Sequence, residues 1–168
     1  MIEIRQFKKE DIPYKIEWVN NKENNKYLHY DLPLREDKTI IWFDTIKNRK
    51  DRIDYTITYE GEPVGLIGLL NIDYINEKAE YYILLGNYKF KRMGISKKAS
   101  KLLIEESYKK FKLKEVYLYT EAENKIAQKL FESIGFLKKD LTADGIKEEI
   151  FMYILLIEEY FNRENKKG

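Results

Sequence analysis

The chain of 168 residues is 43% hydrophobic and 36% charged, with a formal net charge of +2 and no cysteine. These values predict one globular domain over residues 1–161 with a polar tail over 162–168, and they argue against a dedicated nucleic-acid binder. They also exclude disulfides, thiolate zinc sites and a cysteine nucleophile, while the absence of a signal peptide and of a bilayer-length apolar run predicts a cytoplasmic protein without a membrane partner.

The first half of the chain predicts a strand, two helices and three further strands. Apolar and polar residues alternate with a period of two, as in strands, at residues 2–7 and 53–59, and further strands are predicted at residues 64–72 and 79–85. A turn at residues 60–63 makes the second and third of these a hairpin. Apolar residues recur at helical spacing in residues 9–20 and 39–46.

The second half adds helices and strands in alternation. Helical spacing is seen at residues 95–111 and 126–134, the latter ended by Gly135. Strands are predicted at residues 116–120, 136–141 and 149–157, and residues 158–168 as a frayed polar tail. The order β-α-α-β-β-β-α-β-α-β-β predicts a mixed α/β fold, with a central twisted sheet of about seven strands and helices on both faces.

A basic loop precedes the helix that begins near Ile95. Between Gly86 and Ile104 the chain has no Asp or Glu. In this stretch it gathers Lys89, Lys91, Arg92, Lys97, Lys98 and Lys101. A helix N-terminus offers unpaired N–H groups and partial positive charge, and Gly94 permits the close approach of backbone to ligand. The loop therefore predicts a site for a phosphate-bearing molecule, with an ordinary loop and a solvated lysine face as the alternative.

Three segments together resemble the GNAT superfamily of acetyl-CoA-dependent N-acetyltransferases. They are Ala79-Glu80 on a strand, residues 91–96 at a helix start, and residues 124–131 leading into Ile134-Gly135-Phe136. The resemblance covers nearly the whole chain and implies the GNAT fold. It is similar to the branch that includes ribosomal-protein alanine, polyamine and amino-sugar acetyltransferases.

The resemblance implies acetyl-CoA as the cofactor and assigns residues to it. The family's loop motif corresponds to residues 91–96, with Lys91 in place of Gln or Arg and Ser96 as the last small residue. The implied contacts with the cofactor are the backbone of Ile83, Leu84 and Leu85, the loop residues Lys91, Arg92, Met93, Gly94, Ile95 and Ser96, and the side chains of Asn124 and Phe131. Asn124 is equally suited to capping the helix at Lys125, and Phe131 to core packing.

Glu80 matches the acidic strand residue of the family, which implies a base acting through water or a group that holds an ammonium substrate. Its alternative is an outward-facing strand glutamate. Phe131 stands where many members have a tyrosine that protonates the departing thiolate. Three explanations remain: no acid is used, another tyrosine such as Tyr82, Tyr119 or Tyr153 serves, or the site is catalytically degenerate.

The segment with His29 and Tyr30 resembles the lining of the family's acceptor pocket, although His29 could also be an ordinary loop residue. Trp18 and Trp42 are expected in the core. The implied function is direct transfer of an acetyl group to a primary amine of a protein N-terminus, an amino sugar or a polyamine. A polyamine would call for an acidic pocket, to which Asp31, Glu36, Asp37 and Glu80 could contribute, although they could equally be surface charges. The alternatives are a non-catalytic acyl-CoA-binding or regulatory domain and a nucleic-acid binder. A homodimer is a further expectation.

Overall fold

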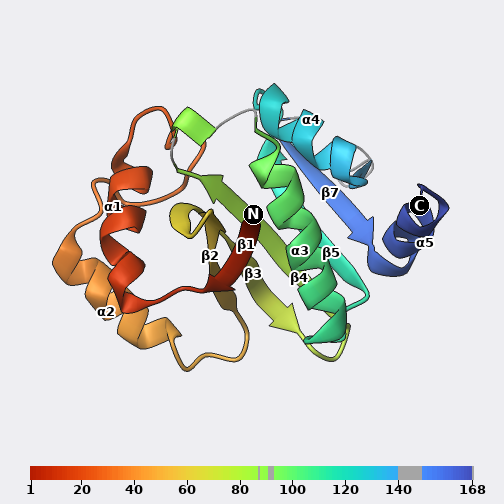
Figure 1. The fold of residues 1–168 in the computed structure, drawn as a ribbon, viewed down its shortest axis with the longest axis horizontal. Helices are drawn as coiled ribbons and strands as arrows, with labels where there is room; N and C mark the ends of the chain where they lie inside the picture. The colour runs from red at the N-terminus through yellow and green to blue at the C-terminus, as the bar shows by residue number, and fades with distance from the viewer. Residues whose placement is uncertain (87, 91–92, 140–148, 168) are drawn as a thin grey trace.

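The fold is a seven-stranded sheet with helices on both faces, seen in a computed structural model that describes residues 1–86, 88–90, 93–139 and 149–167 (Figure 1). The strand order is β1-β2-β3-β4-β5-β7-β6. All neighbouring strands are antiparallel except β4 and β5, which run parallel. The predicted mixed fold of about seven strands is therefore confirmed.

The element order also agrees with the prediction up to the last strand. The strands are β1 (Ile2–Gln6), β2 (Ile53–Tyr59), β3 (Glu62–Asp73), β4 (Lys78–Leu85), β5 (Glu115–Glu121), β6 (Leu137–Lys139) and β7 (Ile150–Leu156). The helices are α1 (Ile12–Asn20), α2 (Glu36–Ile46), α3 (Ile95–Lys109), α4 (Lys125–Ile134) and α5 (Ile157–Lys167), with short 3-10 turns η1 (Lys9–Asp11) and η2 (Tyr88–Phe90).

The strands separate two clusters of buried side chains, because successive residues of a strand point to opposite faces. The larger cluster includes Ile67, Ala79 and Val116 from the sheet, with Ala99 and Leu103 from α3. The smaller cluster lies under α1 and α2 and is formed by Phe7, Ile12, Trp18 and Leu66. The two clusters fix α3 on one face and the α1–α2 pair on the other.

The polar tail predicted from residue 158 onward is wrong for the described residues, because they form α5. The buried side chains of Ile157 and Tyr160 anchor this helix to the large core, and Phe161 packs edge-on against Tyr108 of α3. The Arg163 guanidinium donates to the Gly135 carbonyl at 3.2 Å. These contacts supply the tertiary packing that a short polar helix needs.

Smaller differences concern element ends. Strand β3 begins at Glu62, inside the predicted turn 60–63, and pairs there with Tyr59. Helix α2 begins three residues earlier than predicted, at Glu36. The predicted strand at residues 136–141 is β6, Leu137–Lys139; residues 140 and 141 and the turn at Asp144-Gly145 lie outside the described residues.

Candidate functional site

The centre of the candidate site is a gap between the parallel strands β4 and β5. Their ladder has three pairs, Lys78–Glu115, Ala79–Val116 and Glu80–Tyr117. Beyond the last pair, β4 continues to Leu85 along β3, and β5 continues to Glu121 along β7. The strands therefore part immediately after Glu80 and Tyr117. Backbone groups facing this gap have no ladder partner within the two described strands, and such groups need partners elsewhere.

Ile83, Leu84 and Leu85 all lie on the part of β4 that borders the gap. Each is paired with β3, to Ile67, Leu66 and Gly65 respectively. Their side chains pack into the two cores, with Ile83 and Leu85 on the α3 face and Leu84 on the α1–α2 face. The backbone is thus held rigidly on one side. The predicted packing of the side chains is observed, and contact of the backbone groups with a ligand stays a prediction.

Helices α3 and α4 both begin at the end of the sheet where the gap opens, because each follows one of the two parting strands (Figure 1). Gly94 precedes α3 in the left-handed conformation, with φ of 74°, which favours glycine. The first hydrogen bond of the helix runs from the Lys98 N–H to the Gly94 carbonyl, so the N–H groups of residues 95–97 precede the helical ladder. Apart from its two chain neighbours, no described residue lies within 4 Å of the position a Gly94 Cβ would take.

The other loop residues divide into two groups. Met93 is exposed beside Gly94, whereas the Ile95 side chain is buried in the large core and anchors the start of α3. The Ser96 carbonyl accepts a hydrogen bond from Ser100. Lys91 and Arg92 lie outside the described residues. The described part of the loop therefore presents N–H groups and open space, which suit a phosphate group.

Asn124 and Phe131 both serve structural roles in α4. The Asn124 Oδ1 accepts from the Ala127 N–H at 3.2 Å, so this residue is the N-cap of the helix. Phe131 is 7% exposed and packs against the rings of Tyr81, Phe136 and Tyr153. Contact of either residue with a cofactor stays a prediction.

Glu80 lies at the apex of the gap, half-buried on the sheet face that also carries Tyr82 and Tyr117. Burial raises the pKa of its carboxyl group. Among the described residues, Glu80 has no hydrogen bond or ion pair. A half-buried carboxylate with a raised pKa and no fixed partner can accept a proton or hold an ammonium group.

Two of the three tyrosines considered as proton donors, Tyr82 and Tyr153, already donate hydrogen bonds to carboxylates. The Tyr82 hydroxyl donates to Asp54 at 2.5 Å, and the Tyr153 hydroxyl donates to Glu132 at 2.9 Å. Burial and the adjacent carboxylate raise the pKa of Tyr82 well above its ordinary value and that of Tyr153 to about 12. Both phenols therefore hold their protons tightly. Tyr119 is exposed and packs edge-on against Tyr117.

His29 and Tyr30 belong to the loop between α1 and α2, and this loop reaches across the sheet face. The His29 Nε2 lies 2.8 Å from the Glu121 Oε1 at the end of β5. Tyr30 receives a hydrogen bond of 3.5 Å from the Lys15 ammonium. The structure thus brings both predicted pocket residues to the face that carries Glu80, Tyr117 and Tyr119.

A polar cluster next to this loop was not predicted from the sequence. Lys15 of α1 is 5% exposed, and its ammonium lies 4.1 Å from the centre of the Trp42 ring. The Arg52 guanidinium binds both oxygens of Asp54, at 2.9 and 2.7 Å. A signal was available: Ile12, Lys15 and Val19 share the buried face of α1, so the lysine occupies a core position.

The buried ammonium should make stability depend on pH. Burial, followed by the opposing influences of Asp54 and Arg52, lowers the pKa of Lys15 from 10.5 to about 8. Between these two values the unfolded chain binds more protons than the folded one, so stability rises with pH there. Relative to Lys15→Met, we expect the wild-type free energy of unfolding to rise on the order of 2 kcal/mol from pH 8 to 10.5.

Urea titrations of the two proteins at several pH values measure this difference, in which the titration of all other groups cancels. A difference that stays constant across the window would contradict the low pKa of Lys15.

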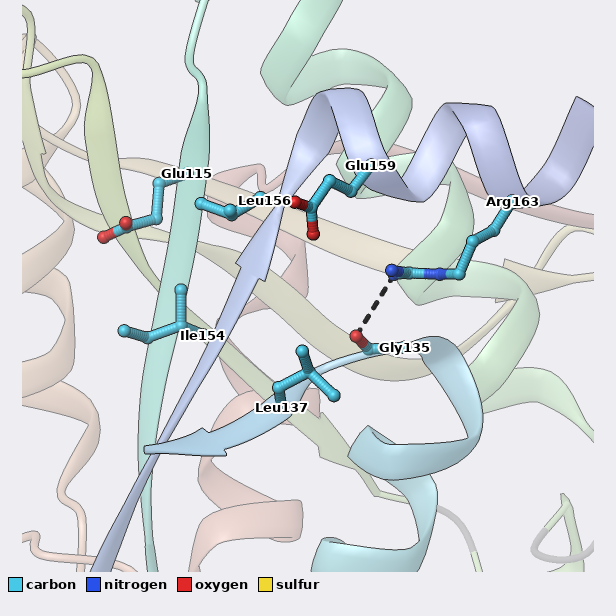
Figure 2. Close-up of a pocket in the computed structure, with 7 residues that line it drawn as sticks. All are labelled: Glu115, Gly135, Leu137, Ile154, Leu156, Glu159 and Arg163. Carbon is cyan, nitrogen blue, oxygen red and sulfur yellow. Dashed lines mark hydrogen bonds between the residues drawn. The ribbon is translucent and has the colours of Figure 1, made fainter. Parts of the chain in front are cut away.

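A pocket of about 290 Å³ lies away from the gap, at the other end of β5 (Figure 2). It is lined by Glu115, Gly135, Leu137, Ile154, Leu156, Glu159 and Arg163. None of the lining residues is a predicted site residue, and two of them, Glu159 and Arg163, belong to α5. No helix in the described ranges is long and apolar enough to cross a membrane, and these ranges contain no cluster of acidic and histidine residues suited to a metal ion.

Comparison with known proteins agrees with this geometry. A family model described as an acetyltransferase (GNAT) domain matches residues 2–137. Spermidine N(1)-acetyltransferase of Escherichia coli K12 is 23% identical over 137 residues, which cover 80% of this chain and 72% of that protein. The putative ribosomal N-acetyltransferase YdaF of Bacillus subtilis is 28% identical over 113 residues, covering 64% of this chain and 61% of that protein.

Solved structures of similar fold include the spermidine N-acetyltransferase of Vibrio cholerae in complex with CoA and spermine. It superposes with a TM-score of 0.83 at 18% identity, covering 95% of this chain and 98% of that one. A dodecameric structure of the same enzyme gives a TM-score of 0.80 at 18% identity, with 96% and 97% covered. The fold, the parting of β4 and β5 and the match to the family model lead to one conclusion: the chain belongs to the GNAT acetyltransferase family.

Proposed function

We propose that the chain transfers an acetyl group from acetyl-CoA to the α-amino group of a polypeptide. The proposal of the donor rests on the gap between β4 and β5, on the N–H groups that precede the helical ladder of α3, and on the space that the described residues leave around Gly94. These features suit a long ligand with a phosphate-bearing end. Acetyl-CoA would supply the activated acetyl group.

The acceptor class follows from the charges on the face that carries Glu80. On β4 and β5, the strands that border the gap, Glu80 is the carboxylate at the gap that has no hydrogen bond or ion pair among the described residues, while Asp31 of the α1–α2 loop is exposed to solvent. Asp54 is bound by Arg52 and Tyr82, and Glu121 by His29. Such a surface suits one amine, because a polyamine with several positive charges needs several free carboxylates.

Two cations also favour an acceptor with a single amine over a polyamine. The Lys15 ammonium and the Arg52 guanidinium both lie beneath α1 and α2, with Asp54 as their shared opposite charge. Tyr30 contacts Lys15, and Tyr117 and Tyr119 of β5 supply further uncharged, aromatic surface on the same face of the sheet. Aromatic side chains of this kind provide contact area for the body of a peptide.

Glu80 is placed to receive the proton of the attacking amine, directly or through water. An α-amine has a pKa near 7.8, so roughly one molecule in seven is neutral at pH 7, compared with about one in 2,500 for a lysine-like amine. A single carboxylate is therefore a sufficient base for an α-amine. The thiolate is a good leaving group, with a thiol pKa of about 8.5, which agrees with a phenylalanine at position 131.

Release of the free thiol of coenzyme A, measured with a panel of amines, tests the proposal. We expect kcat/KM for a short peptide with a free N-terminus to exceed that for spermidine and for glucosamine at least tenfold. The same peptide with an acetylated N-terminus is the control and should give no thiol. A preference for spermidine would replace the peptide by a polyamine as the acceptor.

The second candidate is a non-catalytic acyl-CoA-binding domain, which the phenylalanine at position 131 favours. Isothermal titration with acetyl-CoA separates the two candidates. Tight binding without turnover of any amine in the panel would support the binding domain.

A further inference from the structure

Lys15 is a buried cation that the catalytic proposal leaves unused. An ammonium group has three N–H donors and no acceptor. Among the described residues its one hydrogen bond is the 3.5 Å contact with the Tyr30 hydroxyl, and its other neighbours are the faces of Trp42 and Tyr30, at 4.1 and 5.3 Å from the ring centres. Cation–π contacts stabilise the charge but accept no hydrogen bond of ordinary geometry.

The nearby Asp54 carboxylate does not supply the hydrogen-bond acceptors that the Lys15 ammonium lacks. Asp54 already receives two hydrogen bonds from Arg52 and one from Tyr82. The charged and titratable groups around Lys15 are thus Asp54 on β2, Arg52 just before it, Tyr30 in the loop and Tyr82 on β4. Of these, Tyr30 alone shares a hydrogen bond with Lys15. The lysine is therefore connected to the acceptor side of the molecule through that hydroxyl group.

The contact also fixes the direction of the Tyr30 hydroxyl. Because the ammonium can only donate, the Tyr30 oxygen accepts, and its own proton must point to another acceptor. Tyr30 is 42% exposed and lies beside His29, which reaches Glu121 on the face that carries Glu80. We infer that Lys15 is a positioning residue, which holds Tyr30 as a hydrogen-bond donor to a carbonyl oxygen of the acceptor substrate.

This inference rests on the proposed function and deepens it. A peptide N-terminus carries a carbonyl oxygen one carbon away from the amine, whereas a polyamine carries N–H donors and no oxygen. Lys15 and Tyr30 together present donors only, so they select an acceptor with an oxygen next to its amino group. When Lys15 loses its proton, its lone pair can accept from Tyr30, and the direction of the hydrogen bond reverses.

Alaninamide and isopropylamine form a matched pair for the test, because they share the branched carbon and differ in the carbonyl group. For each enzyme variant, the ratio of the two KM values is measured from pH 6.5 to 9.5. In Lys15→Met, we expect the preference for alaninamide to fall about tenfold below pH 8, with kcat changed less than KM. Because the two amines also differ in pKa, the effect of pH is followed as the wild-type preference divided by that of Lys15→Met, and this quotient should fall above pH 8, near the pKa of Lys15.

Two further variants separate positioning from packing. Tyr30→Phe should lose the same tenfold preference as Lys15→Met, and the double variant should lose no more than either one. Lys15→Arg keeps the positive charge and should extend the preference above pH 8. An equal rise of both KM values in Lys15→Met, or a ratio of the wild-type to the Lys15→Met preference that does not change with pH, would overturn the inference.

Calorimetric titration of alaninamide and isopropylamine into the coenzyme A-bound protein gives the same comparison without turnover. If no amine is acetylated, the proposed function fails, and the binding preference still decides the role of Lys15. If amines are acetylated while the preference is absent, the role of Lys15 fails by itself.

Discussion

Replacing Glu80 with Gln is expected to lower kcat/KM for a peptide amine about 100-fold at pH 7. The substitution keeps the shape of the side chain and removes the carboxylate, which is the proposed acceptor of the amine's proton at the apex of the gap. In the wild type, the rate should rise with pH through the ionisation of Glu80 and of the amine. In Glu80→Gln, the part of the pH–rate profile that reports the ionisation of Glu80 should disappear. Thiol release measured from pH 5 to 9 checks both effects.

Glu115→Gln is the matched control, because Glu115 lies on the same strand face as Tyr117 but at the paired end of β4 and β5. Its kcat/KM should stay within twofold of the wild-type value. An unchanged rate for Glu80→Gln would remove Glu80 from the mechanism. A rise in KM with unchanged kcat would assign it to holding the ammonium group instead.

Replacing Gly86 with Ala is expected to lower the free energy of unfolding by about 3 kcal/mol. A Cβ at this position would lie 2.1 Å from two atoms of the Trp18 ring. Trp18 is buried, and the Gly86 backbone is fixed by hydrogen bonds to Val64 and Asn24. Movement of the ring would therefore lose packing contacts, and movement of the backbone would lose hydrogen bonds. Overpacking of this kind costs about 1–3 kcal/mol or more. Urea unfolding at pH 7 measures the loss.

A double-mutant cycle with Trp18→Ala supplies the control. Removal of the ring opens the space that the new methyl group needs, so the double variant should be no less stable than Trp18→Ala alone. Additive losses would show that the cost of Gly86→Ala comes from elsewhere than the Trp18 ring.

Most of the secondary structure could be predicted because its signals are local. Period-two alternation located β2 at Ile53–Tyr59 without error, and helical spacing located α4 to within one residue. Helix α5 was missed, although Ile157, Tyr160 and Phe161 recur at helical spacing, because its polar composition suggested a solvated tail. Packing against α3 outweighed composition there.

The candidate site was harder to predict from the sequence, because its geometry depends on the pairing of strands that are distant in the chain. Glu80 could be selected from its motif, but the parting of β4 and β5 directly after it follows from strand pairing. Lys15 was overlooked because a lysine is usually a surface residue, and the partner that explains it, Trp42, lies 27 positions along the chain.

The three-pair ladder between β4 and β5 also bears on how the molecule resists local opening. Backbone hydrogen bonds join the half-sheet of β1 to β4 to the half-sheet of β5, β7 and β6 at these positions alone among the described strands. The other connections include backbone hydrogen bonds from Lys114 and Glu115 to the Glu77 carbonyl, the contact of His29 with Glu121, and side-chain packing in the large core. A molecule bound in the gap would touch both half-sheets and stabilise their contact. Binding would therefore slow the exchange of backbone amide protons with solvent in both half-sheets.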